Sequence, residues 1–245
     1  MLLMKGASFL SKDFRIKVFG AGWWFYVVLT ALGLFLLTTF GKGLTYEERL
    51  KLIFILSIIE LIILRIYKFS LKGIRSNYNY FNELPCYLCN QSTLLCIIAS
   101  YTGNQHIMAF CIIVGTLGAT LAFVMPDSYN KDQLFYSKQA FGFYGYHGLL
   151  IITCLSFYAL KVYTPDLHDA LWNMLMIFVL AVIAHVVNYV LRKTDLNPES
   201  NYVFTYHPDN FILEKLYTLL PVKLLYMLPI MPAFGLISFR LLLIM

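Results

Sequence analysis

Three polar side chains lie within long apolar stretches of this sequence, where polar groups are costly and often functional. They are the thiol of Cys89, the imidazole of His147 and the amide of Asn188. A cysteine nucleophile needs these groups, because an imidazole takes the thiol proton and an amide can hold the imidazole in the useful tautomer. The sequence therefore predicts cysteine-based nucleophilic chemistry, with Cys89, His147 and Asn188 as candidate catalytic residues.

Each of these groups also has an ordinary structural explanation. A cysteine in a membrane helix commonly fills space, and a histidine or asparagine commonly hydrogen bonds between helices. Cys86 and Cys89 also form a Cys-x-x-Cys pair, which is typical of thiol–disulfide sites. Glu60, in the middle of the second apolar run, could pair with a histidine or arginine inside the bundle or be protonated and neutral. The five cysteines and the histidine spacing give no zinc pattern, so we expect neither a metal nor a cofactor.

The composition indicates that the elements positioning these groups are membrane helices. The chain has 245 residues, of which 60% are hydrophobic and only 13% are charged, and its mean hydropathy is +0.70. An ordinary soluble domain carries about 25% charged residues. The net charge of +6 does not indicate a nucleic-acid partner, because the basic residues form neither a stripe nor a tail. The expected partners are membrane lipids.

Seven apolar runs approach the roughly 20 residues that one crossing of a bilayer requires. They are Val18–Phe40, Leu50–Tyr67, Leu84–Tyr101, Ile107–Met125, Gln139–Lys161, Ala170–Leu191 and Leu224–Met245. We therefore predict an all-α, polytopic helical bundle in the cell membrane. It forms a single integral membrane domain over residues 1–245, and residues 1–17 form a cytoplasmic N-terminal segment.

The basic residues predict the orientation of these spans. Most of the 19 Lys and Arg residues flank the run ends that share a side with the N-terminus, which places that terminus in the cytoplasm and the C-terminus outside. Cys89 then lies roughly 6 Å from the cytoplasmic end of its helix, and His147 lies about 12 Å from the corresponding end. His185 and Asn188 lie about 5–9 Å from theirs. The prediction is that three helices bring these groups together near the inner leaflet.

Several short motifs, in matching order from about Leu84 onward, resemble the YwaF family of bacterial integral membrane proteins. The segment that carries most of the likeness is similar to a Leu-Pro-x-His-Leu-Cys-Asn element at the start of a middle span. The motifs are Leu84-Pro85-Cys86-Tyr87-Leu88-Cys89-Asn90, Tyr146-His147-Gly148, Asn201-Tyr202 followed by Pro208, and Leu220-Pro221 with Tyr226. Two departures stand out: Tyr87 replaces the usual histidine, and Arg192–Ser200 looks like an insertion.

The YwaF family is related to the eukaryotic transmembrane protein 164, an acyltransferase that acts on phospholipids through a cysteine and a histidine. The resemblance implies a cysteine nucleophile on the third span and His147 as its base. A Pro-Cys pairing selects Cys86 as the nucleophile, whereas the bacterial pattern selects Cys89, which we favour.

The leading hypothesis is a lipid acyltransferase or acyl hydrolase working at the inner leaflet. Cys89 attacks an acyl ester, His147 serves as base and then acid, and Asn188 orients or stabilises. The expected substrate contacts are Asn90, Asn201, Tyr202 and Cys86. The first alternative is a non-enzymatic transporter or lipid-binding scaffold, and the second is a Cys-x-x-Cys membrane thiol oxidoreductase.

Overall fold

The computed structural model describes residues 15–73, 78–126, 133–208 and 211–229, together with Pro232 and Leu236. The regular elements in this part of the chain are helices, and an isolated bridge pairs Arg15 with Leu134. The predicted all-α class is therefore confirmed. Residues 1–14 of the predicted N-terminal segment lie outside the described residues.

The longer elements are α-helices, with short 3-10 turns between them. The α-helices are α2 (Ala21–Gly41), α3 (Tyr46–Ser70), α4 (Leu88–Thr102), α5 (Gln105–Phe110), α6 (Thr116–Val124), α7 (Lys138–Ala159), α8 (Asp169–Lys193) and α9 (Phe211–Leu219). A π-helical turn, η3 (Cys111–Gly115), joins α5 and α6 into one continuous helix. The 3-10 turns are η1 (Leu71–Gly73), η2 (Tyr80–Asn82), η4 (Tyr202–Phe204) and η5 (Leu225–Met227).

Four helical stretches in the described ranges are long and apolar enough to cross a membrane. They are α2, the α5–η3–α6 helix, α7 and α8. The second predicted run corresponds to α3, which has 25 residues but includes Glu60, Arg65 and Lys68. The third run corresponds to α4, whose 15 residues fall short of the roughly 20 that a perpendicular crossing requires.

The predicted seventh span, 224–245, lies largely outside the described residues. Its described beginning is not an α-helix, because Leu225–Met227 form the 3-10 turn η5. Pro221 and Pro229 flank this turn. Proline provides no backbone N–H and disfavours a helical conformation at the residue before it, so these two positions oppose a continuous helix here.

Local signals in the sequence set several helix ends. Thr45 and Glu48 form a capping box at the start of α3, in which each side chain accepts from the other residue's backbone N–H. At the start of α7, the Ser137 hydroxyl accepts from the N–H of Ala140. The helix α4 ends at Thr102 and is capped by Gly103, whose φ of 69° is in the left-handed region that favours glycine.

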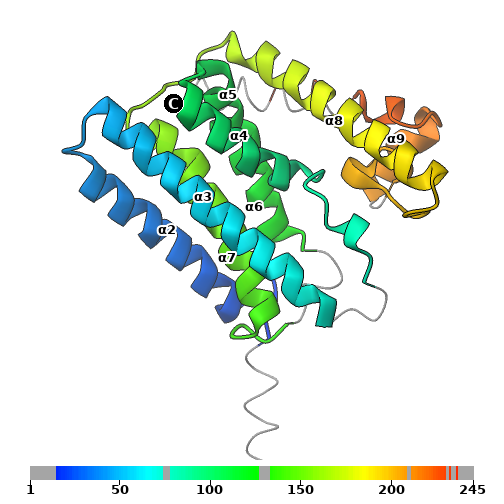
Figure 1. Cartoon of the computed structure of the whole chain (residues 1–245), viewed down its shortest axis with the longest axis horizontal. Helices are drawn as coiled ribbons and strands as arrows, with labels where there is room; N and C mark the ends of the chain where they lie inside the picture. Colours follow the sequence, from blue (N-terminus) through cyan, green and yellow to red (C-terminus); the bar gives the residue numbers. More distant parts are fainter. Residues whose placement is uncertain are drawn as a thin grey trace, which may run out of the picture.

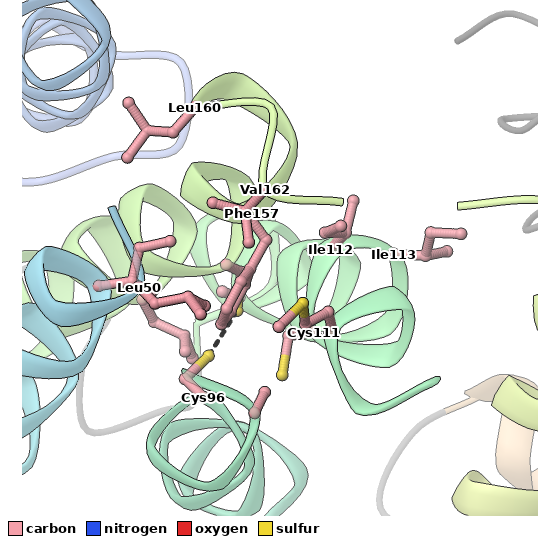
Figure 2. Close-up of a cluster of buried hydrophobic side chains, with 14 of the residues drawn as sticks. Leu50, Cys96, Cys111, Ile112, Ile113, Phe157, Leu160 and Val162 are labelled. Atoms are coloured by element: carbon pink, nitrogen blue, oxygen red, sulfur yellow. Dashed lines mark hydrogen bonds between the residues drawn. The ribbon is translucent and has the colours of Figure 1, made fainter. Parts of the chain in front are cut away.

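Helices α2, α3, α4, α6 and α7 lie side by side as a bundle (Figure 1). The largest group of buried apolar side chains lies between α3, α4, α5–α6 and α7, and includes Cys96, Cys111 and Phe157 (Figure 2). Glycine permits the closest helix contacts. A Cβ atom on Gly142 would lie 2.1 Å from the Tyr67 ring, and one on Gly148 would lie 2.4 Å from the Thr30 hydroxyl. These two positions therefore allow α3 and α2 to approach α7 closely.

Hydrogen bonds between distant segments show which loops share an end of the bundle. The N–H of Ile16 donates to the carbonyl of Gln133 at 2.7 Å, which joins the segment before α2 to the segment before α7. Arg49 Nη1 donates to the carbonyl of Leu160 at 2.7 Å, which joins the start of α3 to the end of α7. The two pairs lie at opposite ends of the bundle, because α7 separates them.

Helix α8 begins beside α5 and then extends away from the bundle toward α9 (Figure 1). Asp169, at its first position, accepts from Tyr163 at 2.8 Å and lies 3.2 Å from Nδ1 of His106. The far end of α8 is tied back to the loop before α4. There Asn79 Nδ2 donates to the carbonyl of Leu196 at 3.0 Å, and Asn197 Nδ2 donates to Oδ1 of Asn82 at 2.6 Å. Both ends of α8 are thus attached to the bundle.

Candidate functional site

A buried polar network joins α3, α4 and α7. The Thr93 hydroxyl donates to Oε1 of Glu60 and lies 2.9 Å from the Tyr146 hydroxyl. Tyr146 in turn donates to Oδ1 of Asn90 at 3.3 Å. Glu60 and Thr93 are fully buried, and Tyr146 and Asn90 are nearly so. We name Glu60, Thr93, Tyr146 and Asn90 the Glu60 network.

Cys89 and His147 are the chain neighbours of two members of this network. Cys89 precedes Asn90 on α4, and His147 follows Tyr146 on α7. Because Asn90 and Tyr146 are hydrogen bonded, Cys89 and His147 lie at a similar level of the bundle. Among the described residues, no hydrogen bond joins the Cys89 thiol to the His147 imidazole.

The tautomer of His147 is set by its own helix. Its Nδ1 lies 2.8 Å from the carbonyl oxygen of Phe143, which has no proton to give, so Nδ1 is the protonated nitrogen. In the neutral ring this leaves Nε2 with a lone pair. The backbone carbonyl of Phe143 therefore does what the sequence analysis assigned to the amide of Asn188.

The two cysteines of the Cys-x-x-Cys pair are free thiols that pack in different surroundings. Cys89, in the first turn of α4, packs against the large core between α3, α4 and α7. Cys86, in the turn before α4, packs against Tyr202 and Ala184. As whole residues, both cysteines are partly buried.

Lys68 brings a positive charge to this part of the molecule. Its Nζ lies 2.5 Å from Oε2 of Glu83 and 5.8 Å from the centre of the Tyr87 ring. Lys68 thus pairs with Glu83 close to the start of α4.

Asn188 lies in a second polar cluster, at the far end of α8. Its Nδ2 donates to the carbonyl of Tyr202 and to the Thr205 hydroxyl, both at 2.9 Å. Its Oδ1 accepts from the Ser200 hydroxyl at 2.7 Å and from the N–H of Tyr202 at 2.8 Å. Its hydrogen-bonding capacity is thus used within this cluster, and the structure does not bring Asn188 to His147. We name Asn188, Ser200, Tyr202 and Thr205 the Asn188 cluster.

Tyr202 and Asn201, the other two predicted substrate contacts in this region, also form hydrogen bonds with backbone groups. The Tyr202 hydroxyl donates to the carbonyl of Phe81 and accepts from the N–H of Leu84 at 3.1 Å. Burial raises the pKa of Tyr202, so its hydroxyl keeps its proton at neutral pH. The Asn201 side chain accepts from the N–H of Tyr206 at 3.0 Å and donates to the carbonyl of His207 at 2.9 Å. Tyr202 thereby supports the turn that carries Cys86.

Comparison with known proteins places the chain in a family. The model of the TMEM164 family matches residues 18–243, which is nearly the whole chain. The chain belongs to the TMEM164 family. Neither the curated proteins nor the solved structures give a match. With four candidate spans and this family membership, this TMEM164-family chain is a multi-pass membrane protein.

The sequence analysis missed two members of the Glu60 network. Thr93 ends the polar run 90–93, which was a signal for a buried polar face on α4. Tyr146 was part of the Tyr146-His147-Gly148 motif, but no role was predicted for it. The partner of Glu60 is the hydroxyl of Thr93 rather than a histidine or arginine. Glu60 Oε2 and Gln91 Oε1 are buried without a hydrogen-bond partner in the described part of the chain, and no group of acidic, histidine or cysteine side chains there is arranged to hold a metal ion.

Proposed function

We propose that this protein is a lipid acyltransferase or acyl hydrolase with Cys89 as nucleophile and His147 as base, acting at the inner leaflet. Membership of the TMEM164 family supports the proposal, because phospholipid acyl transfer is the activity that the family implies. The observation that carries it is the Asn90–Tyr146 hydrogen bond, which holds the helices of Cys89 and His147 at one level. A relationship to the bacterial YwaF family, based on the motifs from Leu84 onward, is also part of this proposal.

The proposed topology has seven spans, with α3 and α4 as the second and third and the N-terminus in the cytoplasm. The hydrogen bond between Ile16 and Gln133 supports it, because the N-terminal segment and the segment before α7 then share one face of the membrane. Both segments carry basic residues: Arg15 and Lys17 lie beside Ile16, and Lys138 begins α7. Membrane lipids are the proposed partners of this site.

In the first step, Cys89 Sγ attacks the carbonyl carbon of an acyl ester. Burial disfavours a free thiolate, so Nε2 of His147 takes the thiol proton as the carbon–sulfur bond forms. The ester carbon–oxygen bond then breaks, and the imidazolium returns the proton to the departing alcohol oxygen. This leaves a thioester on Cys89 and a deacylated lipid.

In the second step, an acceptor hydroxyl or water attacks the thioester. His147 takes the proton of the acceptor and gives it to the departing Cys89 sulfur, which regenerates the thiol.

The other predicted site residues have supporting roles in this proposal. Asn90 acts through Tyr146 by holding α4 against α7. Asn188 and Tyr202 act at a distance by supporting the turn before α4. Cys86 lies in the turn before α4, and Asn201 lies next to Tyr202. A lipid headgroup that enters from the inner leaflet contacts both.

Thioester trapping tests this proposal directly. The full chain in lipid nanodiscs is incubated with a phospholipid whose acyl chain carries an alkyne, quenched in acid and mapped by mass spectrometry. We expect a hydroxylamine-sensitive acyl group on Cys89 that Cys89→Ala abolishes and that His147→Ala slows by at least about 100-fold. Cys86→Ala is the matched control for the neighbouring thiol. Full labelling of Cys89→Ala would reject the nucleophile, and labelling lost only in Cys86→Ala would move it to Cys86.

The non-enzymatic alternative is a lipid-binding scaffold or transporter. The buried Glu60 Oε2, which has no hydrogen-bond partner in the described ranges, favours it, because such an atom can bind a polar group of a ligand. In that case neither thiol is acylated, and Glu60 variants change lipid binding.

A further inference from the structure

Two cationic side chains meet on the ring of Tyr206, outside the site of Cys89 and His147. Lys223 Nζ lies 4.4 Å from the centre of this ring, and Arg192 Cζ lies 4.7 Å from it. Arg192 comes from the last turn of α8, whereas Lys223 follows α9. The fold therefore brings two positive charges from separate segments to one aromatic ring.

Neither cation has an acidic partner in the part of the chain that the structure describes. Arg192 uses Nη1 to donate to the carbonyl of Ser200 at 3.1 Å, which leaves most of its guanidinium N–H groups available. The Lys223 side chain is exposed. Two like charges near one ring repel each other, and an anion bound near both would reduce that repulsion.

The backbone around Tyr206 holds this arrangement in place. The N–H of Leu224 donates to the carbonyl of Thr205 at 2.7 Å, which joins the neighbours of Lys223 and Tyr206. His185 stacks on the Tyr206 ring with a centroid distance of 4.9 Å and hydrogen bonds to the Thr205 hydroxyl at 3.1 Å. The two cations are thus attached to a fixed framework.

Basic residues at the end of a membrane helix commonly serve only to orient it. That explanation suffices for Lys193, which lies 5.6 Å from the ring of Tyr189 and shares it with no other described cation. It does not explain why Arg192 and Lys223 lie on the same ring. A guanidinium and an ammonium together are the donors that bind a phosphate group, the first in a planar fork and the second as a point charge.

We propose that Arg192 and Lys223, arranged on Tyr206, bind the phosphate group of a membrane phospholipid. The position at the end of α8, which the basic residues assign to the cytoplasmic surface, favours a lipid headgroup as the source of that phosphate. The site adjoins the Asn188 cluster, which supports the turn before Cys89. The proposal concerns binding and does not depend on acyl transfer by Cys89.

The test is thermal unfolding of the purified full chain in detergent during titration with three probes. The probes are dioctanoyl phosphatidylglycerol, dioctanoylglycerol without phosphate, and inorganic phosphate. We expect a saturable rise in Tm with phosphatidylglycerol and little response to the other two. The double variant Arg192→Gln/Lys223→Gln should weaken the apparent affinity for phosphatidylglycerol about tenfold or more.

Lys193→Gln is the matched control, since it removes one charge from the same end of α8 and should keep the affinity within about twofold. The exchange Arg192→Lys/Lys223→Arg, which preserves the charges, should restore most of the binding. Three results would overturn the proposal: unchanged affinity in the double variant, an equal loss in Lys193→Gln, or equal binding of dioctanoylglycerol. An equal response to inorganic phosphate would show a site for free phosphate and reject the lipid source.

Discussion

The Glu60 network and the Asn188 cluster are both buried and polar, but they use their hydrogen bonds differently. The Glu60 network joins side chains from three helices and leaves Glu60 Oε2 unpartnered in the described structure. The Asn188 cluster ties one amide equally to backbone groups and side-chain hydroxyls, and every polar atom of Asn188 is engaged. A saturated cluster holds structure, whereas a network with spare capacity remains available to bind or to react.

This difference separates two kinds of polar residue that look alike in a sequence. Glu60 and Asn188 are both completely buried, with 0% solvent exposure each, so both have lost their hydrogen bonds to water. The structure offsets that cost completely for Asn188 and only in part for Glu60. We therefore expect substitutions at Asn188 to act first on stability and substitutions in the Glu60 network to act first on function.

The largest effect is expected from Asn188→Ala. The change leaves the N–H of Tyr202 and the Ser200 hydroxyl buried without their partner, so the free energy of unfolding should fall by about 2–4 kcal/mol. Thermal unfolding in detergent measures it. Acyl transfer by the fraction that remains folded should fall far less than in His147→Ala. A normal Tm with transfer as low as in His147→Ala would show that the saturated cluster is part of the reaction.

A smaller effect of the opposite kind is expected from Glu60→Leu. Removing a buried carboxyl group with an unpartnered oxygen should change the free energy of unfolding by no more than about 1 kcal/mol. Lipid acylation should nevertheless fall about tenfold, because Thr93 and Tyr146 lose the group that positions them. Glu60→Gln keeps an acceptor for Thr93 and should recover most of the acylation. If Glu60→Leu instead lowers Tm as much as Asn188→Ala, the contrast between the two sites is wrong.

The smallest effect is expected from Tyr202→Phe, which removes the hydroxyl between Phe81 and Leu84. The free energy of unfolding should fall by about 1 kcal/mol. Hydrogen exchange should show it locally, as faster exchange of the Leu84 amide with little change in the middle of α7. Tyr136→Phe, at an exposed tyrosine, is the control and should leave both rates unchanged. Uniformly faster hydrogen exchange over the whole bundle would mean that Tyr202 supports the whole fold instead.

The sequence predicted the all-α class and a multi-pass membrane protein, because long apolar runs with few charges are typical of membrane helices. It did not predict which residues face one another. The four consecutive polar residues 90–93 cover all sides of α4 and give no periodic signal for its rotation, so Thr93 was not recognised as the partner of Glu60. Asn188 was predicted to lie near Cys89 and His147, whereas in the structure its hydrogen-bond partners lie in 200–205, next to a stretch that resembled an insertion.

The hydrogen bond from Leu84 to Tyr202 has a consequence for how the molecule is made, because the two residues are 118 positions apart. A ribosome that adds about 5–20 residues per second reaches Tyr202 roughly 6–24 s after Leu84. During that interval the turn before α4 lacks its support, while α4 itself is already leaving the ribosome. The site around Cys89 therefore matures only after the second half of the chain has been synthesised, and chains truncated before Tyr202 should insert without a completed site.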